Sequence, residues 1–105
     1  MDRQPTKAEQ EKFWEWCEFP IEKTAYGRYP DINLNNIFLY AVPKLIETGY
    51  NYELVGWSEG QHKAIINKLC KGWSQTCGAW VSKDPAMALF WVITEEVINE
   101  TSASS

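Results

Sequence analysis

The fold of this chain is decided by the stretch from Tyr50 to Val81, which reads YNYELVGWSEGQHKAIINKLCKGWSQTCGAWV. Its first part alternates apolar and polar side chains with a period of two, which predicts a half-buried strand over Tyr50–Trp57. Ser58-Glu59-Gly60 then predicts a turn. Trp73–Val81 is predicted as a further strand, in which Gly78 indicates a bulge or a place where another backbone or a ligand comes close.

The middle of this stretch, His62–Cys70, fits a helix almost as well as a strand, because its apolar residues suit both periods. Its short length and the flanking Gly60 and Gly72 favour a strand. Three consecutive strands joined by short turns then predict an antiparallel meander.

Helical patterns flank the meander. Thr6-Lys7-Ala8-Glu9 has the form of a capping box and predicts a helix over Lys7–Cys17 that docks through its last turn. The segment from Glu18 to Asp31 contains two prolines and a glycine, and it predicts a loop that could carry a short edge hairpin.

A second helix is predicted from Leu34 to Leu45, with Asp31 or Asn33 as its cap. Pro43 falls inside it, and an interior proline removes a hydrogen bond and clashes with the preceding turn. We therefore expect a bend near Leu39–Val42.

The third helix begins at the clearest local signal, an Asp84 cap followed by Pro85 at the first helical position. Its apolar residues cover more than one narrow stripe, so we expect burial over a broad face. Solvent exposure is expected for three carboxylates of this segment: Glu95, Glu96 and Glu100. Residues 101–105 are predicted to be a disordered tail.

These elements predict one α+β domain over residues 1–105, with its core in about 7–100. The expected architecture is a three-stranded antiparallel sheet packed with two to three helices, in an α-β-α sandwich-like arrangement.

Charge and hydropathy restrict the class of partner. Ten Lys and Arg against fourteen Asp and Glu give a net charge of -4, and the closest basic cluster is Lys63, Lys68 and Lys71. We interpret that cluster as a solvated face that a small anion could still use, and duplex nucleic-acid binding is not expected. No apolar run reaches the ~18 residues that span a bilayer and no leader is visible, so a soluble cytoplasmic protein is expected.

The cysteines are Cys17, Cys70 and Cys77, an odd number without paired C-x-x-C spacing. They are expected to be reduced, mostly buried thiols. Cys70 or Cys77 acting with His62, the one histidine, would make a small hydrolase, which stays an alternative. The spacing predicts no metal site, no cofactor and no catalytic residue.

Three blocks follow one another in the chain: FWEWC at 13–17, DINLNNIFLYAVPKL at 31–45 and KDPAMALFW at 83–91. Together they resemble small, mostly uncharacterised phage and prophage proteins of the phage ABA-sandwich domain type, over roughly Phe13–Glu100. The resemblance implies an α-β-α arrangement and a viral context, in which small acidic proteins often bind host factors. It carries over no catalytic or binding residue.

Aromatic residues are the main candidates for a binding surface. Of six tryptophans, Trp14 and Trp91 are assigned to the core, whereas strand-end positions mark Trp57, Trp73 and Trp80 for a ligand or partner. In the loop before the second helix, Arg28 could hold a phosphate while Tyr26 or Tyr29 stacks on a base.

These features lead to a non-catalytic, phage-type binding protein as the expected function. It would antagonise a bacterial defence system by sequestering a nucleotide-derived signal in an aromatic pocket between two protomers. The alternative is an acidic inhibitor of a host nuclease effector such as a CRISPR enzyme. A homodimer is expected because the small sheet has open edges.

Overall fold

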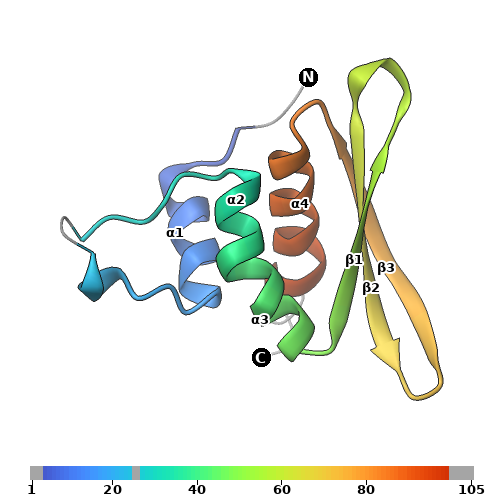
Figure 1. Cartoon of the computed structure of the whole chain (residues 1–105), viewed down its shortest axis with the longest axis horizontal. Coiled ribbons are helices and arrows are strands. Elements are labelled where there is room, and N and C mark those ends of the chain that lie inside the picture. Colours follow the sequence, from blue (N-terminus) through green and yellow to red (C-terminus); the bar gives the residue numbers. More distant parts are fainter. Residues whose placement is uncertain (1–3, 25–26, 100–105) are drawn as a thin grey trace.

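The computed structural model describes residues 4–24 and 27–99, and its ribbon is drawn in Figure 1. Helix α1 spans Lys7–Trp16, and helices α2 (Leu34–Asn36) and α3 (Val42–Glu47) follow after a long loop. The sheet consists of β1 (Tyr50–Gly56), β2 (His62–Cys70) and β3 (Trp73–Ser82). Helix α4 spans Pro85–Ile93 and continues through a π-helical turn at Thr94–Ile98.

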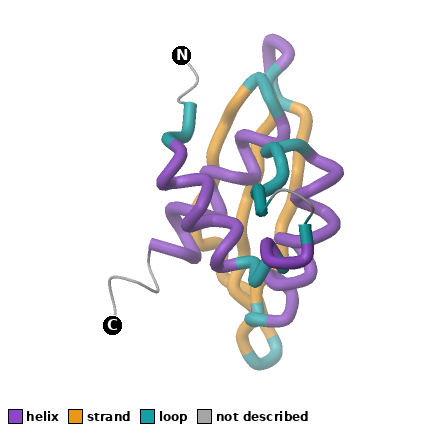
Figure 2. The backbone as a smooth tube through the Cα atoms, turned by 90° about the vertical axis from the view of Figure 1, so that its left-hand side faces the viewer, coloured by secondary structure: helices purple, strands orange, loops and turns teal. Residues whose placement is uncertain are grey.

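The predicted α+β class is confirmed. The three strands form one antiparallel sheet in the order β1-β2-β3, so the ambiguous segment at residues 62–70 is a strand. Helices α1 to α4 lie on one side of this sheet (Figures 1 and 2), so the layers are a pair of helical segments, then α4, then the sheet, and the short 3-10 turn at Ser58–Gly60 connects β1 to β2. The sheet is therefore an outer layer, not the middle layer of a sandwich.

Helix α4 is the centre of the core. Every residue from Ala86 to Ile93 is buried, because the sheet covers one side of this helix and α1 with the α2–α3 segment covers the other. A helix that is apolar all round requires such an enclosed position. The Phe90 ring contacts the Phe13 ring of α1 at 4.8 Å between centroids, and Trp91 stacks on Trp80 of β3 at 5.8 Å.

The helix starts agree with the predicted caps. Thr6 Oγ1 accepts from the Glu9 N–H at 3.1 Å, and Glu9 Oε1 accepts from the Thr6 N–H at 2.9 Å, which completes the capping box. Asp84 Oδ1 accepts from the Ala86 N–H at 2.9 Å. At α2 the cap is Asn33, whose side-chain oxygen accepts from the Asn36 N–H at 2.8 Å.

Pro43 is accommodated by a π-helical turn rather than by a simple bend. The turn covers Ile37–Ala41, and the Val42 N–H donates to the Ile37 carbonyl, five residues back. Pro43 thereby sits in the first turn of α3, where a missing N–H leaves no ladder bond unmade. The described part of the loop, 18–24 and 27–33, contains a short 3-10 turn at Ile21–Lys23 and no strand, so the edge hairpin is absent there.

The sheet has one irregularity. Its register shifts between Ile66 and Asn67, so β3 carries an extra residue, Cys77, at this point. The neighbouring Gly78 lies against the Glu96 side chain, where any β-carbon would overlap the carboxylate. The expected bulge is confirmed, at the residue next to Gly78, whereas the group that comes close to Gly78 is the Glu96 side chain and not a backbone or a ligand. Residues 101–105 lie outside the described range.

Candidate functional site

One cavity of about 350 Å³ lies between α1 and the loop that leads to α2. Its walls come from the first two turns of α1 and from the returning loop. The lining residues are Lys7, Gln10, Glu11, Ile21, Gly27, Arg28, Tyr29, Pro30 and Asp31. We call it the α1 pocket, and its volume is in the range of small-molecule sites.

Hydrogen bonds hold the loop in the shape that forms this wall. The Thr24 hydroxyl donates to the Ile21 carbonyl at 2.8 Å and accepts from the Arg28 N–H at 3.2 Å, which links Arg28 to the 3-10 turn at Ile21–Lys23. The Asn36 side-chain amide donates to the Asp31 carbonyl at 2.9 Å. Hydrogen bonds thus fix the loop at Arg28, through Thr24, and at Asp31, through Asn36.

The charges of the α1 pocket are mixed. Lys7 and Arg28 are exposed cations, while Glu11 and Asp31 supply carboxylates to the same pocket. Burial raises the pKa of the Tyr29 phenol, and the nearby carboxylates of Glu15, Glu11 and Glu22 raise it further. The phenol therefore keeps its proton at neutral pH and is available as a hydrogen-bond donor.

The structure brings together only part of the predicted loop site. Arg28 and Tyr29 line one pocket, and Tyr26 lies outside the described residues. Tyr29 also packs its ring near Phe19, at 6.0 Å between centroids. The α1 residues of the pocket were missed because no local spacing shows that the loop returns to the first turns of α1.

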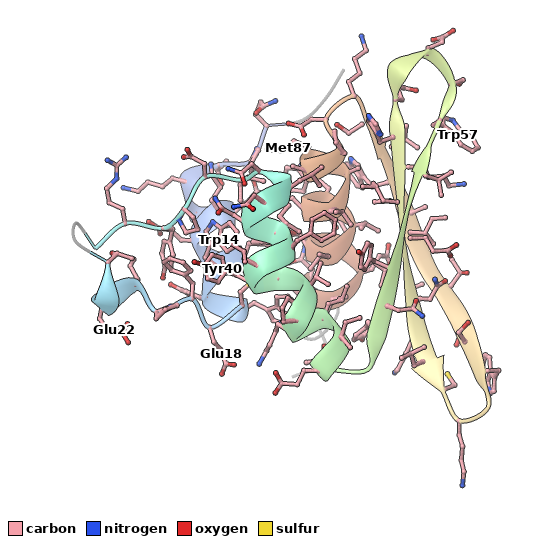
Figure 3. All side chains as sticks on the ribbon, in the orientation of Figure 1. Trp14, Glu18, Glu22, Tyr40, Trp57 and Met87 are labelled. Atoms are coloured by element: carbon pink, nitrogen blue, oxygen red, sulfur yellow. The ribbon has the colours of Figure 1, made fainter. Side chains whose placement is uncertain are left out.

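The three tryptophans selected from the sequence do not share a surface. Trp57 is 50% exposed beyond the end of β1, and Figure 3 shows it at one tip of the sheet, far from Glu22 in the loop. Trp73 is 60% exposed but pairs with Cys70 at the other end of the sheet. Trp80 is half-buried against Trp91, so its position is that of a core residue. An aromatic pocket built from all three does not exist in this chain.

A second cavity, also of about 350 Å³, lies where the π-helical turn after α4 meets the sheet. It is lined by Tyr50, Lys68, Gln75, Cys77 and Glu96. Glu95 and Glu96 are half-buried here rather than fully exposed, because this turn packs its carboxylate-bearing segment toward the sheet. Burial raises the pKa of the Cys77 thiol, and the Glu96 carboxylate adds to the effect.

The cysteines do not assemble with the histidine. His62 pairs with Ser82 at one end of β2 and Cys70 pairs with Trp73 at the other, about 26 Å away along the strand. Cys77 is opposite the middle of β2, about 13 Å from His62 by the same measure. The geometry therefore gives no support to a Cys–His pair.

Cys17 is buried and Cys70 and Cys77 are half-buried, so the expected burial of the thiols is complete for the first and partial for the other two. The last two lie on the β2–β3 hairpin, near the end of the face that the helices cover. Among residues 4–24 and 27–99, no group of three or more His, Cys, Asp or Glu side chains could hold a metal ion.

The lysines do not form a cluster either. Positions 63 and 68 are an odd number apart on β2, so their side chains lie on opposite faces of the sheet, and Lys71 is in the following turn. No helix in the described part of the chain is long and apolar enough to cross a membrane.

Comparison of the chain with family models, with curated protein sequences and with solved structures finds no significant match. The resemblance to phage ABA-sandwich proteins therefore stays a prediction, and the proposal below depends on the geometry of the α1 pocket.

Proposed function

We propose that this protein binds a small nucleotide-derived ligand in the α1 pocket without chemically changing it. In the viral context implied by the resemblance, the role would be to sequester a nucleotide signal of a bacterial defence system. The observation that carries the proposal is the convergence of Lys7, Arg28 and Tyr29, from two separate segments, on one cavity of about 350 Å³.

Each part of a nucleotide has a chemical counterpart in this pocket. The Arg28 guanidinium and the Lys7 ammonium are suited to phosphate oxygens. Carboxylates such as those of Glu11 and Asp31 accept hydrogen bonds from ribose hydroxyls and from exocyclic amines. The Tyr29 side chain offers an aromatic surface and a phenol donor beside them.

The balance of charge in the pocket further restricts the class of ligand that it can bind. The pocket contains two cations and two carboxylates, so a bare polyanion gains little binding free energy there. The carboxylates of Glu15 and Glu22 near Tyr29 also repel a nucleic-acid duplex. A suitable ligand brings hydrogen-bond donors as well as one or two phosphates.

The test is calorimetry and thermal shift against a panel of cyclic dinucleotides, cyclic trinucleotides and ADP-ribose derivatives. A ligand present at about a hundredfold its Kd stabilises the fold by about 2.7 kcal/mol, which gives a readable rise in Tm. Arg28→Gln should weaken binding about tenfold or more, because a charged hydrogen bond is lost. Lys71→Gln, which also removes one positive charge but in an exposed turn of the sheet, serves as the control.

Mass spectrometry of the recovered ligand distinguishes binding from catalysis. Intact ligand at fixed stoichiometry supports sequestration, whereas a converted product contradicts a non-catalytic role. No Tm shift across the panel, or equal loss of affinity in the Lys71→Gln control, would overturn the assignment of the α1 pocket.

A second candidate function is favoured by the carboxylates that surround Tyr29. Glu15 and Glu22 are exposed and lie outside the lining of the α1 pocket. Together with Glu11, their carboxylates raise the pKa of the Tyr29 phenol. Such a surface would suit the basic nucleic-acid channel of a host nuclease effector. That function predicts salt-sensitive association with a basic host protein, lost in Glu15→Gln/Glu22→Gln but retained in Arg28→Gln.

A further inference from the structure

Among residues 4–24 and 27–99, one face of the sheet is not covered by a helix. Figure 1 shows α1 to α4 on the same side, and the side chains that point the other way belong to alternate residues of each strand. We call this side the open face. It includes Val55 of β1, Ile65 of β2, and Ala79 and Val81 of β3, because these alternate with core-facing residues such as Leu54, Ala64 and Trp80.

The open face is more apolar than a solvated sheet face usually is. The register places Val55, Lys63 and Val81 in one row across the three strands, and Glu53, Ile65 and Ala79 in the next. Val55 is 41% exposed and Val81 37% exposed. Four apolar residues in two adjacent rows form a continuous patch, which we call the open-face patch: Val55, Ile65, Ala79 and Val81.

Ordered polar groups border this patch. The Lys63 ammonium lies 4.6 Å from the centre of the Trp57 ring, which draws the charge to one edge. On the other side, the Asn67 amide donates to Glu53 Oε2 at 3.0 Å and its oxygen accepts from the Thr76 hydroxyl at 3.0 Å. Asn67 is only 8% exposed, so this row is held in place before any partner arrives. The face therefore combines apolar side chains with two charged side chains, Lys63 and Glu53, that are held in place within the same rows, a mixed composition that is typical of non-obligate interfaces.

We propose that the open face docks a second copy of this chain, sheet against sheet, about a two-fold axis. Charge decides between a copy and other partners. The chain as a whole has a net charge of -4 and would repel itself through most of its surface. The rows of the open-face patch instead contain one cation, Lys63, and one carboxylate, Glu53, so the patch is neutral and complementary to itself.

A two-fold axis that lies between the two sheets, parallel to them and passing midway between Lys63 and Glu53, brings each Lys63 near the Glu53 of the partner copy. The apolar residues of the two patches then meet at the ~10 Å spacing of stacked sheets, and the helices stay on the outside. Such a contact is isologous and closes at two copies. It does not involve the α1 pocket, so it stands independently of the proposed function.

The size of the open face indicates a reversible dimer. Three strands of seven to ten residues span a face of about 15 by 25 Å at ordinary strand spacing. Counted on both copies, that footprint is about 750 Å², below the ~1,200 Å² of standard specific interfaces and in the size class of transient contacts, so we expect weak, reversible association.

The experiment is sedimentation velocity on the full chain from about 1 to 500 μM, a range that brackets a micromolar Kd. The wild type should move from monomer to dimer across this range. Lys63→Glu should raise the dimer Kd about tenfold or more, because like charges then face each other twice per dimer. The swap Glu53→Lys/Lys63→Glu should restore association, and Lys71→Glu, an equal charge change in the hairpin turn, should leave the Kd unchanged.

Val81→Thr provides a second route if the charge swap perturbs the Glu53–Asn67 hydrogen bond. It keeps a β-branched side chain at an exposed strand position and should weaken the dimer without unfolding the chain, as checked by circular dichroism. A monomer throughout the range overturns the proposal. A dimer unaffected by both Lys63→Glu and Val81→Thr also overturns it, and would indicate association through the sheet edges.

Discussion

Cys17 shows how burial of one side chain couples folding to pH. The residue is 8% exposed at the end of α1, and burial raises the pKa of its thiol from 9.0 to about 12, with the Lys44 ammonium acting in the opposite direction. The folded chain keeps this proton in a range where the unfolded chain releases it. The stabilisation is therefore complete below pH 9 and is lost progressively between pH 9 and pH 12.

We expect the free energy of unfolding of the wild type to fall by about 1 kcal/mol more than that of Cys17→Ala between pH 7 and pH 10. Urea denaturation of both proteins at several pH values measures this difference. If the free energy of unfolding changed with pH in the same way for the wild type and Cys17→Ala, the raised pKa of the Cys17 thiol would be contradicted.

Gly78 and Glu96 form the tightest side-chain contact at a glycine in this chain. A β-carbon at position 78 overlaps the Glu96 side chain, so Gly78→Ala must displace that flexible group. We expect the cost of Gly78→Ala to be at least about 0.5 kcal/mol larger in the wild type than in Glu96→Ala. A double-mutant cycle by urea denaturation gives the coupling, and additive effects would contradict the contact.

At the scale of the element, α1 depends on its capping box. Two hydrogen bonds link Thr6 and Glu9 reciprocally. Thr6→Ala should therefore cost about 1 kcal/mol of unfolding free energy, whereas Thr6→Ser, which keeps the hydroxyl, should cost much less. Thermal unfolding of the two variants side by side measures the contribution, and equal losses would indicate that packing of Thr6, not capping, is responsible.

The helical segment from Leu34 to Glu47 illustrates the limit of element-level prediction. Its apolar spacing and its asparagine cap were visible in the sequence, and Pro43 indicated that the regular helix could not continue. A bend and a π-helical turn both relieve the clash of a proline ring with the preceding turn. Which of them forms depends on the surroundings, because the turn also buries Ile37 and Ala41 in the core.

At the scale of the whole molecule, α4 joins the helical layer to the sheet. Phe90 is fully buried and contacts Phe13 of α1, while its neighbour Trp91 stacks on Trp80 of the sheet. Phe90→Ala should cost about 3 to 5 kcal/mol, a large part of the stability of a small domain. The unfolding transitions of this variant measured by far- and near-ultraviolet circular dichroism should have the same midpoint, because both layers depend on this helix. Leu39→Ala, at a position that is 57% exposed, should change stability far less.

The sequence by itself determined most of the elements, because caps, turns and hydrophobic periods act over a few neighbouring residues. The capping box at Thr6, the Asp84-Pro85 helix start and the alternation of Tyr50, Tyr52 and Leu54 each specify local structure without reference to the rest of the chain. The antiparallel meander follows from three strands with short turns, and Arg28 and Tyr29 were found because their side-chain chemistry is conspicuous.

Only the tertiary structure decided which distant residues meet. Lys7 and Arg28 are 21 positions apart, and they share a pocket because the loop folds back along α1. Trp80 became a core residue because α4 places Trp91 against it, and the sheet kept one face open because all the helices pack on the other. These outcomes depend on how whole surfaces are buried against each other, and no short-range pattern encodes that arrangement.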